Sequence, residues 1–175
     1  MSTPNPGPMR QVGYVVENLE TAVAQWQSLT GRGPWTCFLN AVLVGRLHGR
    51  DATVAIDVGL GYVDDLEIEL ISPRSTVSPY HGADGRLLTG VHHVAWFSDD
   101  LDASIRAAEE RGLQATFVAT NPVTRVAYLE SRSTPGTRIE YIQYTPDGLA
   151  GWRQRLEAAR NWNGKDPVQV YDLSG

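Results

Sequence analysis

The sequence has 175 residues, of which 42% are hydrophobic and 20% are charged, a balance that allows a buried globular core. Its net charge is −5 and its only lysine is Lys165, which argues against a nucleic-acid partner and a catalytic Schiff base. No apolar stretch approaches the roughly 18 residues that span a bilayer, so no membrane association is expected. Cys37 is the only cysteine, so no intrachain disulfide can form, and we expect a cytoplasmic protein.

The first part of the chain predicts one strand, one helix and several further strands. Residues 1–9 are rich in Pro and Gly and predict a flexible leader rather than a secretion signal. The block 10–72 opens with a strand that leads through the cap residue Asn18 into an amphipathic helix, which should end at Gly31. Runs of β-forming residues follow the helix at 35–39, 41–46, 53–58 and 66–71.

The second part of the chain predicts the same succession. Residues 73–89 contain prolines and glycines that are typical of a connector. The block 90–146 opens with a strand, the cap residue Asp100 and a helix that should end at Gly112. Runs of β-forming residues follow at 115–119, 125–130 and 138–144. Residues 147–175 predict a C-terminal helix and then a tail without a clear pattern.

The two blocks share a beginning and an end, which marks an internal repeat. Residues 12–22 and 94–104 both read as a strand, a capping Asn or Asp and an acidic first helical turn. Ile-Glu-Leu-Ile at 68–71 matches Ile-Glu-Tyr-Ile at 139–142. One βαβββ block alone would leave a sheet face uncovered. We therefore predict an α+β fold in which two paired βαβββ modules form a cup-shaped mixed β-sheet with helices outside.

Strand alternation indicates which polar side chains face the cup. In the strand closing the first block, apolar residues should pack under the helix, which turns Glu67 and Glu69 inward. The matching strand turns Glu140 inward, and Gln11 and His93 are equivalent on the opening strands. A pseudo-two-fold axis would gather Gln11, Glu69, His93 and Glu140, a donor set for one divalent Zn, Ni, Co, Mn or Fe ion. Each residue taken alone is more often structural; their equivalent positions support the joint site.

Several motifs together resemble a known superfamily. They are Arg10–Glu20, Gly90-Val91-His92-His93-Val94-Ala95, Ile68–Pro73, Pro135–Glu140, Gly33-Pro34-Trp35 and Ser78-Pro79-Tyr80. The sequence resembles the vicinal oxygen chelate (glyoxalase/bleomycin resistance/dioxygenase) superfamily from residue 10 to about residue 146. Within it, the motifs are similar to those of the branch that holds glyoxalase I and methylmalonyl-CoA epimerase.

The resemblance implies roles for the inward-facing residues. It makes Gln11, Glu69, His93 and Glu140 the metal ligands, while His92 should face the helices and be structural. Gln11 stands where epimerases carry His and where the eukaryotic type of glyoxalase I carries Gln. The implied activity is that of a metal-dependent isomerase, epimerase or lyase, which transfers a proton next to a metal-chelated carbonyl through an enediolate. Glu140 is the expected base and Glu69 its expected partner.

The expected partner is a small-molecule carbonyl substrate. Arg138 shares the inward face of its strand, where it either binds an anionic substrate group or pairs with a neighbouring carboxylate. Trp35, Phe38 and Tyr80 are candidates for the substrate mouth, although aromatic residues more commonly belong to the core. Glu67 is a less favoured third carboxylate. A homodimer is expected by analogy with the superfamily alone.

Three other functions remain open from the sequence. An extradiol dioxygenase of this superfamily uses two His and one Glu on iron, which Gln11 disfavours. A metal-free small-molecule binding protein of the bleomycin-resistance type is the main rival, but such proteins lack the ligand set. A structural or interaction role is the third alternative. Metal content would separate the enzyme from the last two.

Overall fold

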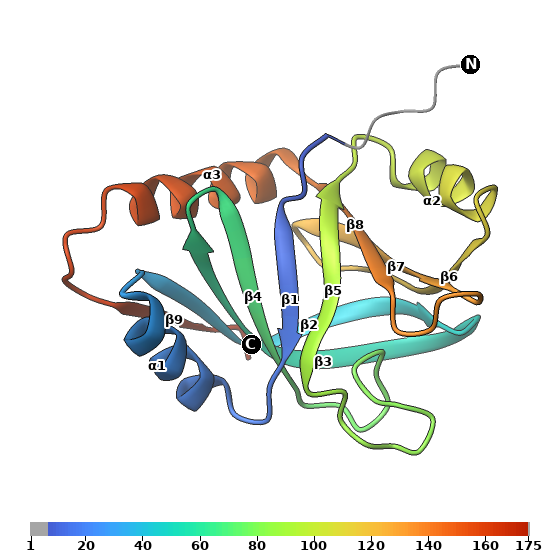
Figure 1. Ribbon diagram of the computed structural model, residues 1–175, viewed down its shortest axis with the longest axis horizontal. Helices are drawn as coiled ribbons and strands as arrows, with labels where there is room; N and C mark the ends of the chain where they lie inside the picture. Colours follow the sequence, from blue (N-terminus) through green and yellow to red (C-terminus); the bar gives the residue numbers. More distant parts are fainter. Residues whose placement is uncertain (1–6, 175) are drawn as a thin grey trace.

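The computed structural model describes residues 7–174 as two βαβββ modules followed by a helix and a short strand (Figure 1). The first module comprises β1 (Gln11–Val15), α1 (Leu19–Thr30), β2 (Trp35–Leu47), β3 (Arg50–Val63) and β4 (Leu66–Pro73). The second comprises β5 (Gly90–Phe97), α2 (Leu101–Glu109), β6 (Leu113–Thr120), β7 (Thr124–Ser131) and β8 (Arg138–Tyr144). The chain then forms α3 (Pro146–Arg160) and β9 (Val168–Asp172). The predicted leader, residues 1–9, lies largely outside the described residues.

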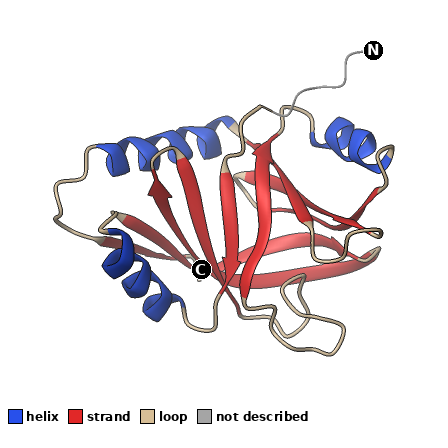
Figure 2. Cartoon of the chain, viewed as in Figure 1, coloured by secondary structure: helices blue, strands red, loops and turns tan. Residues whose placement is uncertain are grey.

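The nine described strands form one sheet that curves into a cup (Figure 2). In each module the first strand pairs in parallel with the last, and the modules join where β1 and β5 run antiparallel. A second antiparallel join, between β2 and β6, closes the sheet on its other side. The three described helices lie outside, so the predicted α+β fold of paired βαβββ modules is confirmed. None of these helices is long and apolar enough to cross a membrane.

Both module helices begin at the predicted cap residues. The side chains of Asn18 and Asp100 each accept a hydrogen bond from a backbone N–H in the first helical turn. Gly31 ends α1 with a φ of 64°, a left-handed conformation that glycine adopts without strain. α2 instead ends at Glu109. The predicted stop, Gly112, lies further along the chain, after a non-helical turn, and has a φ of 88°.

The packing of α1 fixes which residues of β4 face the cup. Leu19 of α1 packs with Ile68 and Leu70 of β4 on the outside of the sheet. Because successive strand residues point to opposite faces, this packing turns Glu67 and Glu69 to the inside. The inward direction of both carboxylates therefore follows from the burial of their apolar neighbours.

The two short runs predicted at 35–39 and 41–46 are one long strand, β2. A β-bulge lies between them, at Asn40, which has a φ of 58° and shifts the pairing with β3. The polar Asn40 separates the two predicted strands in the sequence, but in the structure it belongs to β2 and its backbone N–H donates to the side chain of Asp57. The bulge lets the two halves of β2 pair with different strands, β9 and β6.

The tail contains a strand that the sequence does not reveal. β9 pairs in parallel with the first half of β2, and Tyr171 stacks on Phe38 with ring centroids 5.5 Å apart. The residues of β9 are all exposed, so the strand lacks the alternation between buried and exposed positions that would mark it. Leu173, directly after β9, reaches the rim of the cavity inside the cup.

Candidate metal site

Two rows of neighbouring residues cross the strands and point into the cup. One row consists of Glu69, Gly13 and His93, and the other of Gln11, Ala95 and Glu140. In each row one small residue separates two polar ones. The repeat relates the two rows, because Glu69 is equivalent to Glu140, Gly13 to Ala95 and His93 to Gln11. The sheet register thus brings the four predicted ligands to one place, although they are distant in sequence.

The imidazole of His93 lies at the centre of this cluster. Its Nε2 atom is 3.0 Å from Oε2 of Glu140, 3.3 Å from Oε2 of Glu69 and 3.1 Å from Oε1 of Gln11. One candidate ligand atom from each of Glu69, His93 and Glu140 lies within 4.8 Å of the others. The side chain of His93 is fully buried, while that of Glu69 is 16% exposed and opens to the cavity.

His92 does not face the helices, so that prediction is wrong. The pairing of β1 with β5 shifts by one residue at His92 and His93, which places both imidazoles on the cup side. His92 packs against the rings of Tyr80 and Tyr128, which belong to the core inside the cup. Strict alternation of side chains fails at such a bulge, and the sequence carries no sign of it.

A hydrogen-bond chain sets the tautomer of His93. The Nε2 atom of His92 is 3.0 Å from the carbonyl oxygen of Pro79, which can only accept, so this nitrogen carries the proton. The Nδ1 atom of His92 is therefore an acceptor, and it lies 3.1 Å from Nδ1 of His93, which donates to it. In the neutral ring, Nε2 of His93 then has a free lone pair that faces the carboxylates.

Glu67 holds the amide of Gln11 in the matching orientation. The amide nitrogen of Gln11 donates to Oε1 of Glu67 at 2.8 Å, which turns the amide oxygen toward His93. Glu67 is fully buried and also accepts a hydrogen bond from the hydroxyl of Tyr62. Arg155 of α3 lies on the far side, with its guanidinium 3.8 Å from Oε2 of Glu67. Glu67 therefore faces the cup as predicted, but it contacts the cluster through Gln11.

Burial and mutual repulsion shift the protonation of the cluster. Burial raises the pKa of Glu140 to about 7, and Glu69 adds to the rise, while His93 opposes it. Burial alone lowers the pKa of His93, but the neighbouring carboxylates Glu140 and Glu69 outweigh it and raise the value to about 9. Without another cation, the cluster thus depends on one protonated imidazole to balance its carboxylates.

The donor set fits a divalent cation. The Oε2 atoms of Glu69 and Glu140 are buried and have no hydrogen-bond partner, and His93 can give a proton from Nε2 to only one acceptor at a time. Unpaired buried carboxylate oxygens are costly unless a cation compensates them. One imidazole nitrogen, two carboxylates and one amide oxygen suit the metals that prefer mixed nitrogen and oxygen ligands.

Gly13 makes room for the imidazole, a role that the sequence pattern did not reveal. A Cβ atom at this position would lie 2.0 Å from Cε1 and 2.3 Å from Nε2 of His93. The ring therefore lies directly against the backbone of β1, and only glycine permits that approach. An isolated glycine inside a strand is the signal that could have drawn attention to it.

Comparison with known proteins identifies the family. A family model described as the glyoxalase/bleomycin resistance protein/dioxygenase superfamily matches residues 10–128. The chain belongs to this superfamily. The resemblance noted in the sequence is therefore confirmed. No curated protein sequence matches the chain.

Several solved structures share the fold at low sequence identity. A methylmalonyl-CoA epimerase from Mycobacterium tuberculosis is 20% identical, with a TM-score of 0.56 over 81% of this chain and 91% of the epimerase. A hypothetical protein from Bacillus halodurans is 19% identical, with a TM-score of 0.56 over 79% and 94%. A Streptomyces coelicolor methylmalonyl-CoA epimerase in complex with 2-nitronate-propionyl-CoA is 17% identical, with a TM-score of 0.54 over 79% and 95%.

The cup of this superfamily member encloses a cavity of about 410 Å³ beside the cluster. Gln11, Glu69 and Glu140 form its polar end, and its walls are mainly aliphatic and aromatic. Two of the predicted mouth residues, Phe38 and Tyr80, line it. A cavity of this size is at the small end of ligand sites in proteins.

The other two predicted substrate residues lie elsewhere. Trp35 is buried in the core between α1 and the sheet and is not among the residues that line the cavity. Arg138 also lies outside the cavity lining and forms an ion pair with Glu130 at 2.9 Å, which is the second of the two roles predicted for it. Successive side chains of β2 point to opposite faces, so Trp35 points outward, whereas Phe38, just before the bulge, points into the cavity.

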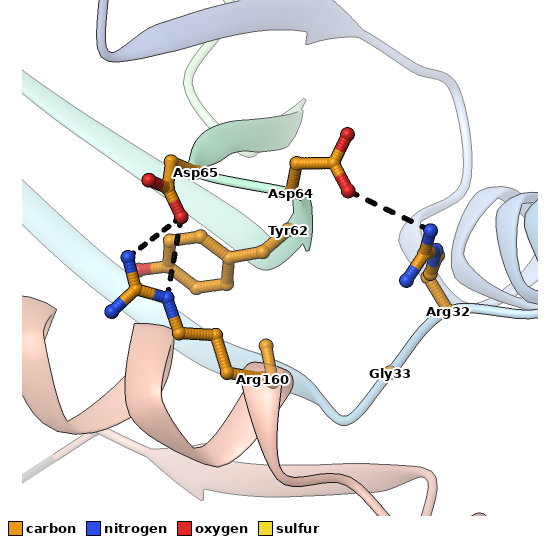
Figure 3. Close-up of a pocket in the computed structure, with 7 residues that line it drawn as sticks. Arg32, Gly33, Tyr62, Asp64, Asp65 and Arg160 are labelled. Carbon is orange, nitrogen blue, oxygen red and sulfur yellow. Dashed lines mark hydrogen bonds and ion pairs between the residues drawn. The ribbon is translucent and has the colours of Figure 1, made fainter.

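A second hollow, of about 280 Å³, lies on the outer surface near the end of α3 (Figure 3). Its charged side chains neutralise one another: Arg160 pairs with Asp65 at 2.8 Å, and Arg32 lies 3.6 Å from Asp64. Tyr62 contributes its ring to this hollow, while its hydroxyl group donates to Glu67 on the cavity side. Ion pairs between exposed side chains are common and contribute little, so they do not mark a site.

Proposed function

We propose that this chain is a divalent-metal-dependent enzyme that transfers a proton at a carbon next to a carbonyl group, as an isomerase, an epimerase or a lyase. The observation that carries the proposal is a pair of buried carboxylate oxygens, from Glu69 and Glu140, without hydrogen-bond partners at the end of an apolar cavity. Membership of the superfamily and a fold shared with methylmalonyl-CoA epimerases support the same class of reaction.

Gln11, Glu69, His93 and Glu140 would hold the metal ion. When bound, a divalent ion supplies Lewis acidity that polarises a carbonyl group and so acidifies the neighbouring carbon. The surrounding side chains would orient the ligands. His92 hydrogen-bonds the imidazole of His93, and Glu67 hydrogen-bonds the amide of Gln11. The mainly apolar walls lower the local dielectric constant, which would strengthen the electrostatic interactions within the site.

Glu140 would remove the proton from the substrate carbon. Its Oε2 atom has no hydrogen-bond partner and lies at the polar end of the cavity, where a carboxylate can accept a proton from a bound substrate. Glu69 lies on the other side of His93 Nε2 and is partly open to the cavity. Two carboxylates would allow one to take a proton and the other to return it, as in a two-base epimerisation.

Metal content and isotope exchange test this proposal. Protein purified without chelators should contain metal by elemental analysis, or take up one equivalent of Zn, Ni, Co or Mn. The loaded protein should catalyse deuterium exchange at the acidic carbon of a panel of small α-acidic carbonyl compounds in D₂O, followed by NMR. His93→Ala removes the only nitrogen ligand and should lose the ion.

Glu140→Gln is the more discriminating variant. It keeps an oxygen donor, so metal should remain, while exchange should fall by about 10²- to 10⁴-fold because the base is gone. Glu130→Gln is the matched control, because this carboxylate pairs with Arg138 outside the cavity. Full exchange in Glu140→Gln would make Glu69 the next candidate base. Failure of the wild-type protein to bind any of these metals would refute the enzyme and favour the metal-free binding protein.

A homodimer and a cytoplasmic location remain predictions. The first is tested by sedimentation at micromolar concentration, where a monomer would contradict it.

A further inference from the structure

One cationic side chain lines the cavity, and one of its N–H donors has no hydrogen-bond partner. Arg155 of α3 is the only Lys or Arg among the described residues that line the cavity. Its side chain is 19% exposed, and its Nε atom is buried without a hydrogen-bond partner. A guanidinium group has N–H donors arranged in a fixed fork, and a buried donor left unpaired is destabilising. The partly exposed guanidinium is therefore the one cationic side chain available to a ligand among the described residues of the cavity wall.

The contact with Glu67 does not account for this guanidinium. Glu67 already accepts hydrogen bonds from Gln11 and Tyr62, one on each carboxylate oxygen. Its distance of 3.8 Å from Arg155 exceeds a hydrogen bond, so the pair balances charge without satisfying the donors. The guanidinium also lies 6.0 Å from the ring centre of Phe38, which also lines the cavity.

We propose that Arg155 binds a carboxylate group of the substrate. A carboxylate matches the guanidinium fork with two parallel hydrogen bonds. The charge balance favours a singly charged group over a phosphate dianion, because Glu67, Glu69, Glu140 and Asp147 also line the cavity and would repel a second negative charge.

The position of Arg155 further restricts the class of substrate. Successive contacts lead from His93 through Gln11 and Glu67 to Arg155, so the guanidinium is on the same wall as the metal cluster. The rest of the cavity wall is mainly aliphatic and aromatic. The substrate would therefore be a small carbonyl compound that chelates the ion at one end and carries a separate carboxylate near it, an assignment that rests on the proposed function.

Matched ligands test this assignment. Aliphatic hydroxamates of increasing length that end in a carboxylate are compared with their methyl esters by titration calorimetry on the Zn-loaded protein. At the best length the carboxylate should bind about 10- to 100-fold more tightly than its ester. Arg155→Gln should abolish that preference, and Arg155→Lys, which keeps the charge balance with Glu67, should reduce it. Arg160→Gln, on the same helix but at the outer hollow, should leave it unchanged.

The outcomes separate the assignment from the proposed function. Equal binding of acid and ester at every length, or a preference that survives in Arg155→Gln, would overturn the carboxylate assignment even if isotope exchange is observed. An Arg155-dependent preference without any isotope exchange would support the assignment and refute the enzyme. If the protein takes up no metal, hexanoate and hexanamide are compared by ligand-observed NMR. A preference for hexanoate that is lost in Arg155→Gln supports the assignment, and any other result overturns it.

Discussion

Gly13→Ala should displace the imidazole of His93 and so abolish metal binding. The added Cβ would lie 2.0 Å from Cε1 and 2.3 Å from Nε2 of His93. Non-bonded carbon atoms are most stable at roughly 3.5 Å or more, so the ring would have to move by about 1.5 Å. Metal–ligand distances tolerate deviations of only about 0.2 Å. His93 would then no longer reach an ion that Glu69 and Glu140 share.

Two measurements test the effect of Gly13→Ala, one of metal affinity and one of stability. Competition with a chromophoric chelator gives the metal affinity, which should fall by about 100-fold or more, since even partners that only orient a ligand contribute about 10- to 100-fold. Thermal unfolding of the metal-free protein should show a loss of about 1–3 kcal/mol, the usual effect of overpacking. Gly61→Ala is the control, because its Cβ would lie 2.6 Å from Cε2 of Trp35, a core residue outside the cavity.

Comparison of the two variants shows whether loss of metal comes from displacement of His93 or from lower stability. Gly61→Ala should lose stability to a similar extent and keep its metal. Wild-type metal affinity in Gly13→Ala would refute the view that the glycine places His93 as a ligand. Loss of metal from both variants would show that general destabilisation, and not displacement of the ring, is the cause.

Three further predictions concern the surroundings of the cluster. His92→Leu removes the acceptor for Nδ1 of His93 and should weaken metal affinity by about 10- to 100-fold in the chelator competition. Glu67→Gln weakens the partner that orients Gln11 and should reduce the same affinity by about 10-fold. In the metal-free protein, the raised pKa values of His93 and Glu140 mean that folding strengthens proton binding, so calorimetric stability should fall as pH rises from about 5 to about 9. Saturating Zn should remove this decline, and a rise in stability over that range would contradict it.

The parts of this site that the sequence predicts are those that follow from repetition and alternation. Glu69 and Glu140 lie on the equivalent strands that close the two modules, and the burial of Ile68 and Leu70 leaves Glu69 only one direction in which to point. The equivalence of Gln11 and His93 in the repeat then suffices to bring four distant residues together. These features depend on local periodicity, which a single sequence records.

Other parts depend on contacts that periodicity does not record. His92 turns into the cup because β5 slips by one residue against β1, and no residue type marks that slip. Arg155 reaches the cavity only because α3 packs across the cup, so its role follows from the path of the chain after the repeat. The strand β9 is exposed throughout and is held by pairing with β2 and by stacking of Tyr171, rather than by burial.

The pseudo-symmetry of the cluster also explains why it holds one imidazole and not two. His93 lies opposite Gly13, whereas Gln11 occupies the equivalent position opposite Ala95. From the symmetry of the two modules we expect the Ala95 methyl group to obstruct a ring at position 11, as a Cβ at position 13 would obstruct His93. A flexible Gln side chain can avoid that methyl group. Gln11→His alone should therefore fail to tighten metal binding, while Gln11→His combined with Ala95→Gly should give a second nitrogen ligand and an affinity above that of the wild type. Chelator competition measures both, and a single variant that binds as tightly as the double one would show that Ala95 does not limit this position.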